Sequence, residues 1–167
     1  MNDSIDTFVK LLSHARQTVD RSNAIYEELA NVAEDDEIKQ ALTARAFIRS
    51  TQLSKIDEAF KLLGKKPVEL PGRIQEVFAE EFRGELSGLK SPGAKKMFVL
   101  ATAIQIAHWR VGEWKALVAA ADFTENYGVG VLLETCLADD LAFAERTRRI
   151  LRRRAESKLA ARAGSSM

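Results

Sequence analysis

Hydrophobic residues recur at alternating spacings of three and four along the first part of the chain, from about Ser4 to Ala33. This spacing places them on one face of a helix. Asp3 or Ser4 is suited to cap the start of that helix. We therefore predict a long amphipathic helix, whose face is formed by Phe8, Leu12, Ala15, Val19, Ser22, Tyr26 and Leu29.

A second helix is predicted to begin at residues 34–37 (EDDE). Acidic side chains cap a helix start and interact favourably with the backbone dipole there. Gly64 supplies the left-handed residue that ends a helix. The connection to the first helix is only a few residues long, so the two helices should be antiparallel neighbours. The apolar positions of the second helix are Ile38, Leu42, Ile48, Ile56, Phe60 and Leu63.

The segment from Gly64 to Ser91 contains two prolines and several glycines. It is too broken for a long helix and too long for a turn, so we expect a crossover with one short helix at residues 73–82. Ser91 and Pro92 then form a strong helix start, with a serine cap followed by proline at the first helical position. This helix is predicted to run to about Ala121, and Thr124 is predicted to cap a last helix that continues through Leu151.

Two antiparallel helix pairs joined by a long crossover predict an all-α, ferritin-like four-helix bundle with one short extra helix. No stretch alternates in the manner of a β-strand. We expect a single domain over residues 1–167, with the bundle at about 5–150 and a basic helix end and tail at 151–167. A long helix of about 30 residues would span roughly 45 Å.

Composition is that of a globular protein, with 46% hydrophobic and 29% charged residues. Cys136 is the only cysteine, which excludes an intramolecular disulfide and a zinc–thiolate cluster. The N-terminus resembles no secretory signal, and no apolar run approaches the length of a membrane span. We therefore expect a cytoplasmic protein with no membrane partner.

The net charge of +1 hides a basic C-terminal end, because residues 146–167 contain eight Lys or Arg residues and only one acidic residue, Glu156. Such a run can bind phosphate groups of nucleic acid. It contains no aromatic residue for base stacking, so a solvated or oligomer-facing end is the favoured interpretation and nucleic acid the less favoured one. The candidate nucleic-acid residues are Arg148, Arg149, Arg152, Arg153 and Arg154.

Five stretches of the sequence resemble the bacterial YciE/YciF family, in matching order and spacing over about residues 5–150. They are FVKLLSHA at 8–15, DDEIKQAL at 35–42, LSKIDEAFKLLGKKP at 53–67, ATAIQIAHWRVGEW at 101–114 and VLLETCLADDLA at 131–142. The resemblance implies a ferritin-like fold, an association with stress responses and a homodimer.

Ferritin-like carboxylate proteins hold two metals with Glu from two helices and Glu-x-x-His from the other two. The resemblance aligns these ligand positions with residues that lack the required groups. Only His108, Asp139 and Asp140 remain as metal candidates, and they are too few for a bridged pair. We therefore expect no cofactor; if a metal binds, iron or manganese is expected. The aligned positions are Val19, Phe47, Ser50, Ala107 and Arg110.

Individual residues have ordinary structural interpretations beside the functional ones. His108 is expected to bond to a neighbouring helix, and Asp140, near the apolar face, is expected to pair with His108 or Arg45. Cys136 should be a small buried hydrophobe. Trp109 and Trp114 suit core packing and subunit contact equally.

No catalytic residue is identified, so a non-catalytic bundle with a stress-associated or interaction role is the leading hypothesis. The alternatives are a metal-handling oxidoreductase with a reduced site at His108, Asp139 and Asp140, and a nucleic-acid-associated protein that uses the Arg-rich end. A dimer or larger assembly is expected, because several apolar residues fall off the inward stripe. They are Phe47, Trp109, Trp114, Leu117 and Phe123.

Overall fold

The computed structural model describes residues 2–164, without the side chains of 2 and 73–75, and is helical throughout its regular elements. Residues 165–167 of the predicted tail lie outside the described part. Within the described residues, no helix is long and apolar enough to cross a membrane. The five helices are α1 (Asn2–Val32), α2 (Asp36–Leu63), α3 (Arg73–Gly88), α4 (Pro92–Phe123) and α5 (Tyr127–Gly164).

The helix ends follow the capping signals in the sequence. The side chain of Asp35 accepts hydrogen bonds from two backbone N–H groups at the start of α2, and Ser91 accepts one from Ala94 N at 3.1 Å at the start of α4. Gly64 ends α2 with φ of 62°. The cap predicted at Thr124 is wrong: Thr124 ends α4 by donating from its backbone N–H to Ala120 O, and α5 begins only at Tyr127.

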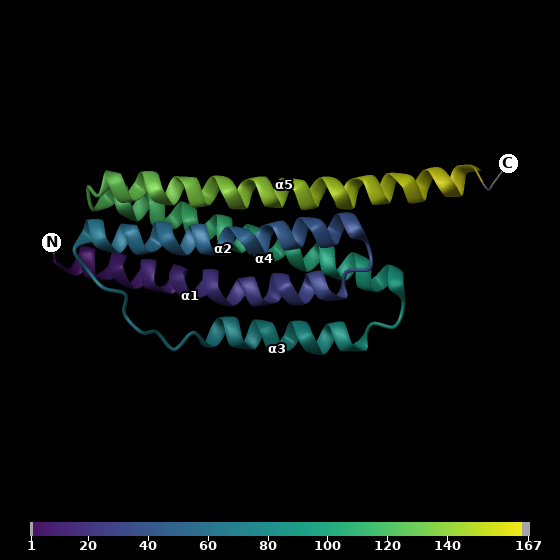
Figure 1. The fold of residues 1–167 in the computed structure, drawn as a ribbon, viewed down its shortest axis with the longest axis horizontal. Helices are drawn as coiled ribbons and strands as arrows, with labels where there is room; N and C mark the ends of the chain where they lie inside the picture. The colour runs from purple at the N-terminus through teal and green to yellow at the C-terminus, as the bar shows by residue number, and fades with distance from the viewer. Residues whose placement is uncertain (1, 165–167) are drawn as a thin grey trace.

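The four long helices form the predicted bundle, with α1/α2 and α4/α5 as the two hairpins (Figure 1). The crossover helix α3 lies along the outside of the bundle, on the side away from α5 (Figure 1). It is longer than the predicted 73–82, and it packs against α4 through aromatic contacts. Phe82 stacks on Phe98 at 5.6 Å, and Phe78 meets Trp109 edge to face at 6.0 Å between ring centroids.

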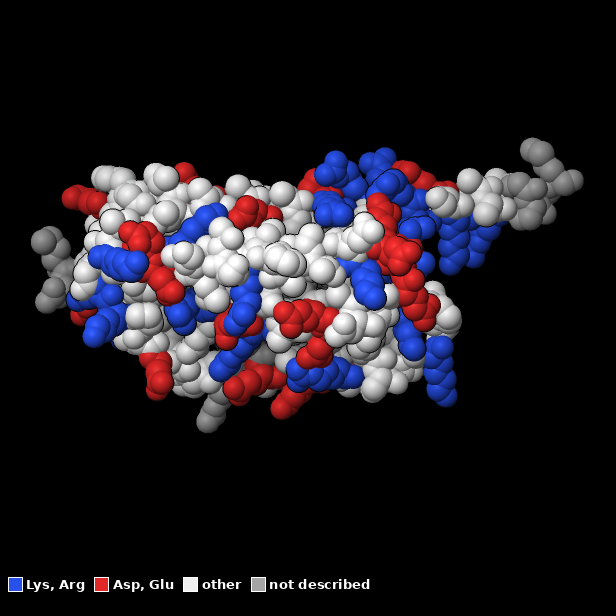
Figure 2. All heavy atoms as spheres, viewed as in Figure 1, with Lys and Arg blue, Asp and Glu red and all other residues white. Residues whose placement is uncertain are grey.

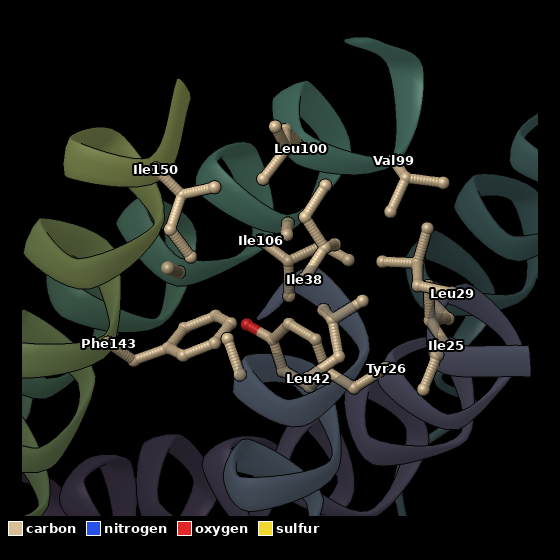
Figure 3. Packing of buried hydrophobic residues seen from close by; sticks show 14 of the residues in the cluster. Ile25, Tyr26, Leu29, Ile38, Leu42, Val99, Leu100, Ile106, Phe143 and Ile150 are labelled. Carbon is tan, nitrogen blue, oxygen red and sulfur yellow. The ribbon is translucent and has the colours of Figure 1, made fainter. Parts of the chain in front are cut away.

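The apolar core is divided into two clusters. One cluster joins the C-terminal half of α1 to the N-terminal parts of α2 and α4, and Figure 3 shows its packing around Tyr26 and Phe143. The other joins the N-terminal half of α1 to the far end of the bundle, and it contains Trp114, Leu133 and Cys136. The predicted burial of Cys136 is therefore confirmed. Between the two clusters lies a layer of buried polar side chains, which is the candidate site.

Candidate functional site

The carboxylate of Asp140 stands at the centre of the polar layer. Asp140 lies on α5 and is fully buried. Its Oδ2 accepts hydrogen bonds from Trp114 Nε1 on α4 at 2.6 Å and from Gln52 Nε2 on α2 at 3.1 Å. Its Oδ1 lies 2.6 Å from Nη2 of Arg45, also on α2. A buried carboxylate is tolerated only with such partners, so this pairing confirms the prediction of Arg45 as a partner of Asp140.

Arg110 on α4 is the second buried cation of the layer. Its side chain is fully buried, and its Nε lies 4.0 Å from Asp140 Oδ2. Its guanidinium lies over the Trp114 ring, 4.3 Å from the ring centroid, which is a cation–π geometry. Its Nη1 donates to Glu113 of the same helix. Arg110 is thus held between two carboxylates and an indole face.

Glu113 continues the chain of charges to the surface. It accepts a hydrogen bond from Thr18 Oγ1 at 3.2 Å and lies 3.3 Å from His14 Nδ1, and both partners belong to α1. The hydrogen bond with Glu113 raises the pKa of His14 above its ordinary value. His14 and Glu113 line an open groove of about 390 Å³ between α1 and α4. An alternating series of basic and acidic side chains therefore crosses the bundle: Arg45, Asp140, Arg110, Glu113 and His14.

Aromatic rings connect this layer to the apolar cluster beside it. The Arg45 guanidinium lies 5.0 Å from the centroid of Tyr26 and 5.9 Å from that of Phe143. These two rings meet edge to face at 5.2 Å, and Figure 3 shows the Tyr26 hydroxyl directed toward Phe143. Burial raises the pKa of the Tyr26 phenol. The phenol therefore stays neutral beside the cation.

The buried side chains of the polar layer offer few groups that could coordinate a metal ion. Guanidinium groups only donate hydrogen bonds and stay protonated in proteins, so Arg45 and Arg110 repel a divalent cation instead of coordinating it. Asp140 is the only fully buried carboxylate among the described residues. In the same part of the chain, no three His, Cys, Asp or Glu side chains converge in a way that could hold a metal ion.

The three metal candidates from the sequence do not come together. Asp140 is in the core, whereas Asp139 is half-buried and pairs with Lys55 of α2 at 3.3 Å. His108 is exposed, and its Nδ1 donates to Ile104 O of its own helix at 2.9 Å. The predicted bond from His108 to a neighbouring helix is therefore wrong. The ring lines the same outer groove as His14, away from Asp140.

The two positions of α2 that the resemblance aligned with metal ligands lie on the outside of the bundle. Phe47 is 79% exposed and Ser50 is exposed, so neither faces the bundle centre. The inward positions at this level are Arg45 and Gln52. On α1 and α4, by contrast, the aligned positions Val19, Ala107 and Arg110 are all buried.

The sequence pattern did not identify Gln52 or Glu113 as residues of the site, and it placed Tyr26 only on an apolar helix face. For the two tryptophans it did not distinguish core packing from subunit contact. Trp114 and Leu117 are core residues, which corrects their prediction as outer-surface contacts. Trp109 is half-buried against α3. A usable signal existed for Gln52: it lies seven residues after Arg45, two helical turns away on the same face, and the two side chains are hydrogen-bonded at 3.3 Å.

The basic end is held by ion pairs within the chain. Arg153 donates to Glu37 and Arg154 to Asp35, which ties α5 to the start of α2. Arg148 and Arg149 reach Glu145 at 2.9 and 3.8 Å, and Arg152 reaches Glu156 at 2.9 Å. Figure 2 shows basic side chains gathered over the C-terminal half of α5. All five candidate nucleic-acid residues thus have an acidic neighbour.

Comparison with known proteins places this architecture in a family. A family model described as a domain of unknown function, DUF892, matches residues 4–160. No curated protein matches the chain significantly. Among solved structures, the Escherichia coli stress protein YciF matches with a TM-score of 0.82 and 18% identity, over 90% of this chain and 95% of that chain.

Two further structures have the same fold. One is YcfI, described as a putative structural protein from Rhodopseudomonas palustris, with a TM-score of 0.77 and 18% identity over 89% of this chain and 92% of that chain. The other is a protein from Xanthomonas campestris pv. campestris, with a TM-score of 0.75 and 16% identity over 96% of this chain and 99% of that chain. The ferritin-like bundle and the family resemblance predicted from the sequence are confirmed, and this chain belongs to the DUF892 family.

Proposed function

We propose that this chain is a non-catalytic ferritin-like bundle that acts through association, as a homodimer, in a stress-associated role. The observation that carries the proposal is the position of Arg45 and Arg110 beside Asp140 in the middle of the bundle. In this proposal, two guanidinium cations take the place that two metal cations have in ferritin-like carboxylate proteins. The layer then stabilises and orients the helices and carries out no reaction.

Charge balance supports this assignment. Two divalent cations in a bundle interior need several carboxylates as ligands and as compensating charge. Here Arg45 and Arg110 face Asp140 and Glu113, so two positive charges already meet two negative ones. Bringing in a divalent cation would require the displacement of a buried guanidinium. That displacement would leave a buried charge without a partner, which costs about 3–5 kcal/mol.

The descriptions of two structural relatives favour an association role. YciF is described as a stress protein and YcfI as a putative structural protein. Neither description names a reaction. The similarity of these proteins to this chain lies in the fold, so the stress-associated role belongs to the proposal.

Elemental analysis tests the metal part of the proposal. The protein is produced in medium supplemented with iron and manganese and purified without chelators. We expect iron, manganese and zinc far below one equivalent per chain, and a melting temperature that neither EDTA nor added metal changes. One or two equivalents of bound metal, lost in an Asp140→Asn variant, would support the alternative of a metal-handling protein. His108→Gln serves as the matched variant, because this ring bonds only within its own helix.

A DNA column tests the remaining alternative on the same preparation. Binding through phosphate contacts falls steeply with salt. Because the five arginines already have acidic neighbours, we expect no retention at physiological salt. Retention that falls when Arg148 and Arg149 are replaced by Ala would support a nucleic-acid role instead.

A further inference from the structure

The outer face of α5 carries a regular stripe of exposed residues, spaced alternately by four and three. A mean spacing of 3.5 residues is that of the seam between two paired helices. The stripe lies opposite the face of α5 that carries Cys136, Asp140 and Phe143 into the bundle. Its residues, here called the α5 stripe, are Tyr127, Val131, Glu134, Ala138, Leu141, Glu145, Arg148, Arg152, Ala155 and Leu159, and every one of them is exposed.

Much of the α5 stripe is apolar although it faces outward. Tyr127 is 64% exposed, Val131 61% and Leu159 66%. Leu141, at the middle, is 45% exposed. A row of this length on the solvent side of one helix indicates a contact surface, because single exposed apolar residues are ordinary but an ordered row is not.

The spacings of the α5 stripe read the same in both directions, so a second copy of this helix can pair with it in antiparallel orientation. If a second copy of the helix lies antiparallel with position 143 opposite position 143, each of the ten stripe residues lies opposite a stripe residue of the other copy. Apolar residues then meet at both ends: Tyr127 lies opposite the partner's Leu159, and Val131 opposite the partner's Ala155. We propose that two copies of this chain associate through this antiparallel pairing of their α5 stripes.

Charge complementarity supports this register. Glu134 lies opposite the partner's Arg152, and by symmetry this ion pair forms twice. In the described part of the chain Glu134 has no ion-pair partner of its own. Ala138 lies opposite the partner's Arg148, whose aliphatic stem can cover a small apolar residue. Leu141 lies opposite the partner's Glu145, a carboxylate that Arg148 and Arg149 of its own helix already neutralise.

The pairing also explains the length of α5. This helix has 38 residues, and Figure 1 shows its C-terminal part running past the rest of the bundle. All residues from 152 to 163 are exposed, so within one copy this segment packs little against the bundle. In the antiparallel dimer this overhang lies against the partner's α4–α5 turn, where Phe123 is 80% exposed. An isologous contact of this kind closes as a two-fold dimer.

This surface rests on the proposed homodimer, and a charge swap tests it. Glu134→Arg places two cations opposite each other twice per dimer, so we expect the dimer dissociation constant to rise at least about tenfold. Arg152→Glu should do the same. The double variant Glu134→Arg/Arg152→Glu restores opposite charges, so its dimer dissociation constant should return to within about threefold of the wild-type value. Glu81→Arg, on the exposed side of α3, is the matched control and should leave the dimer intact. Sedimentation equilibrium measures all four.

Disulfide trapping tests the register by itself. Val131→Cys/Ala155→Cys should give a covalent dimer under oxidation, because the two positions face each other between copies. Within one helix they are about 36 Å apart, too far to bond. Ala138→Cys/Ala155→Cys lies on the same stripe in the wrong register and should stay uncrosslinked. The native Cys136 does not interfere, because it is fully buried and burial raises the pKa of its thiol to about 11.

The outcomes separate this inference from the proposed function. A wild-type protein that is monomeric at tens of micromolar overturns both the α5 pairing and the homodimer. A dimer that tolerates Glu134→Arg and forms no Val131→Cys/Ala155→Cys disulfide overturns only the α5 pairing and moves the interface elsewhere. Crosslinking of the Ala138→Cys/Ala155→Cys variant overturns the register. Restoration by the double charge swap together with the first disulfide supports the inference.

Discussion

The indole of Trp114 on α4 donates a hydrogen bond to the Asp140 carboxylate on α5, with 2.6 Å between Nε1 and Oδ2. Both side chains are fully buried. The same indole presents its face to the Arg110 guanidinium. Trp114 therefore binds the Asp140 anion through its N–H group and the Arg110 cation through its ring face. In this way it links these two charges within the α4/α5 hairpin.

Replacement of Asp140 should destabilise the protein strongly. Asp140→Asn keeps the shape of the side chain but leaves Arg45 and Arg110 without their shared carboxylate. Removing one partner of a buried ion pair costs about 3–5 kcal/mol. Urea unfolding, followed by circular dichroism, measures this loss. Asp139→Asn is the control: its partner Lys55 is partly exposed, so a loss below about 1 kcal/mol is expected. Equal losses in the two variants would contradict the role assigned to the buried layer.

The ion pair between His14 and Glu113 should make stability depend on pH. The pKa of His14 is raised in the folded protein by its hydrogen bond with Glu113. The protonated ring therefore stabilises the fold below the unfolded pKa of about 6.5, and this contribution is lost as the pH rises through the folded pKa. The difference in unfolding free energy between wild type and His14→Gln should be larger at pH 5 than at pH 8.

A double variant checks the cause of that pH dependence. In a Glu113→Gln background the His14 ring has lost the carboxylate that raises its pKa. The further change His14→Gln should then no longer cost more at pH 5 than at pH 8, because burial and the charges of Arg110 and Arg21 lower the pKa of the ring once the carboxylate is gone. A cost that is still larger at pH 5 in this background would assign the effect to another neighbour of His14.

Asp35 should be important because it joins three helices. It caps α2 through Glu37 N and Ile38 N, and its Oδ2 contacts Lys96 of α4 and Arg154 of α5. Asp35→Ala should cost about 1–2 kcal/mol for the lost cap alone. Asp35→Asn keeps a capping oxygen and loses only the charge, so it should lower the unfolding free energy by less than Asp35→Ala does. This loss should become smaller still in high salt, which screens the ion pairs of the wild type. Chemical denaturation at low and high salt measures both.

The charge of Asp35 also gives a pH effect of the opposite sign to that of His14. Burial by itself would raise the pKa of Asp35, but the Ile38 N–H, Lys96 and Arg154 outweigh it, and the net pKa is lowered. Its contribution is therefore present above the unfolded pKa of about 3.9 and is lost as the pH falls through the folded pKa. Asp35→Asn should flatten the dependence of stability on pH below about pH 4. An unchanged acid limb would contradict this assignment.

The sequence by itself determined where most of the helices begin and end. Ser91 with Pro92, Asp35 and Gly64 act through local hydrogen bonds and backbone conformation, which depend only on neighbouring residues. The lengths of the three connections, short, long and short, can also be read directly from the sequence. They were sufficient to predict the topology of the four-helix bundle. Thr124 failed as a start signal because a threonine hydroxyl can also bond back to a carbonyl, here Ala120 O at 2.8 Å, at the end of the preceding helix.

Only the tertiary structure decided which residues meet in the middle of the bundle. The hydrophobic pattern of α2 is weakest between Leu42 and Ile56, where the buried positions Arg45 and Gln52 are polar and leave no apolar signal. Phe47 lies two residues after Arg45, and because a helix rotates by about 200° over two residues, it points away from the core and is exposed. Arg45 and Asp140 are far apart in the sequence, and only the packing of α2 against α5 brings their charges to 2.6 Å.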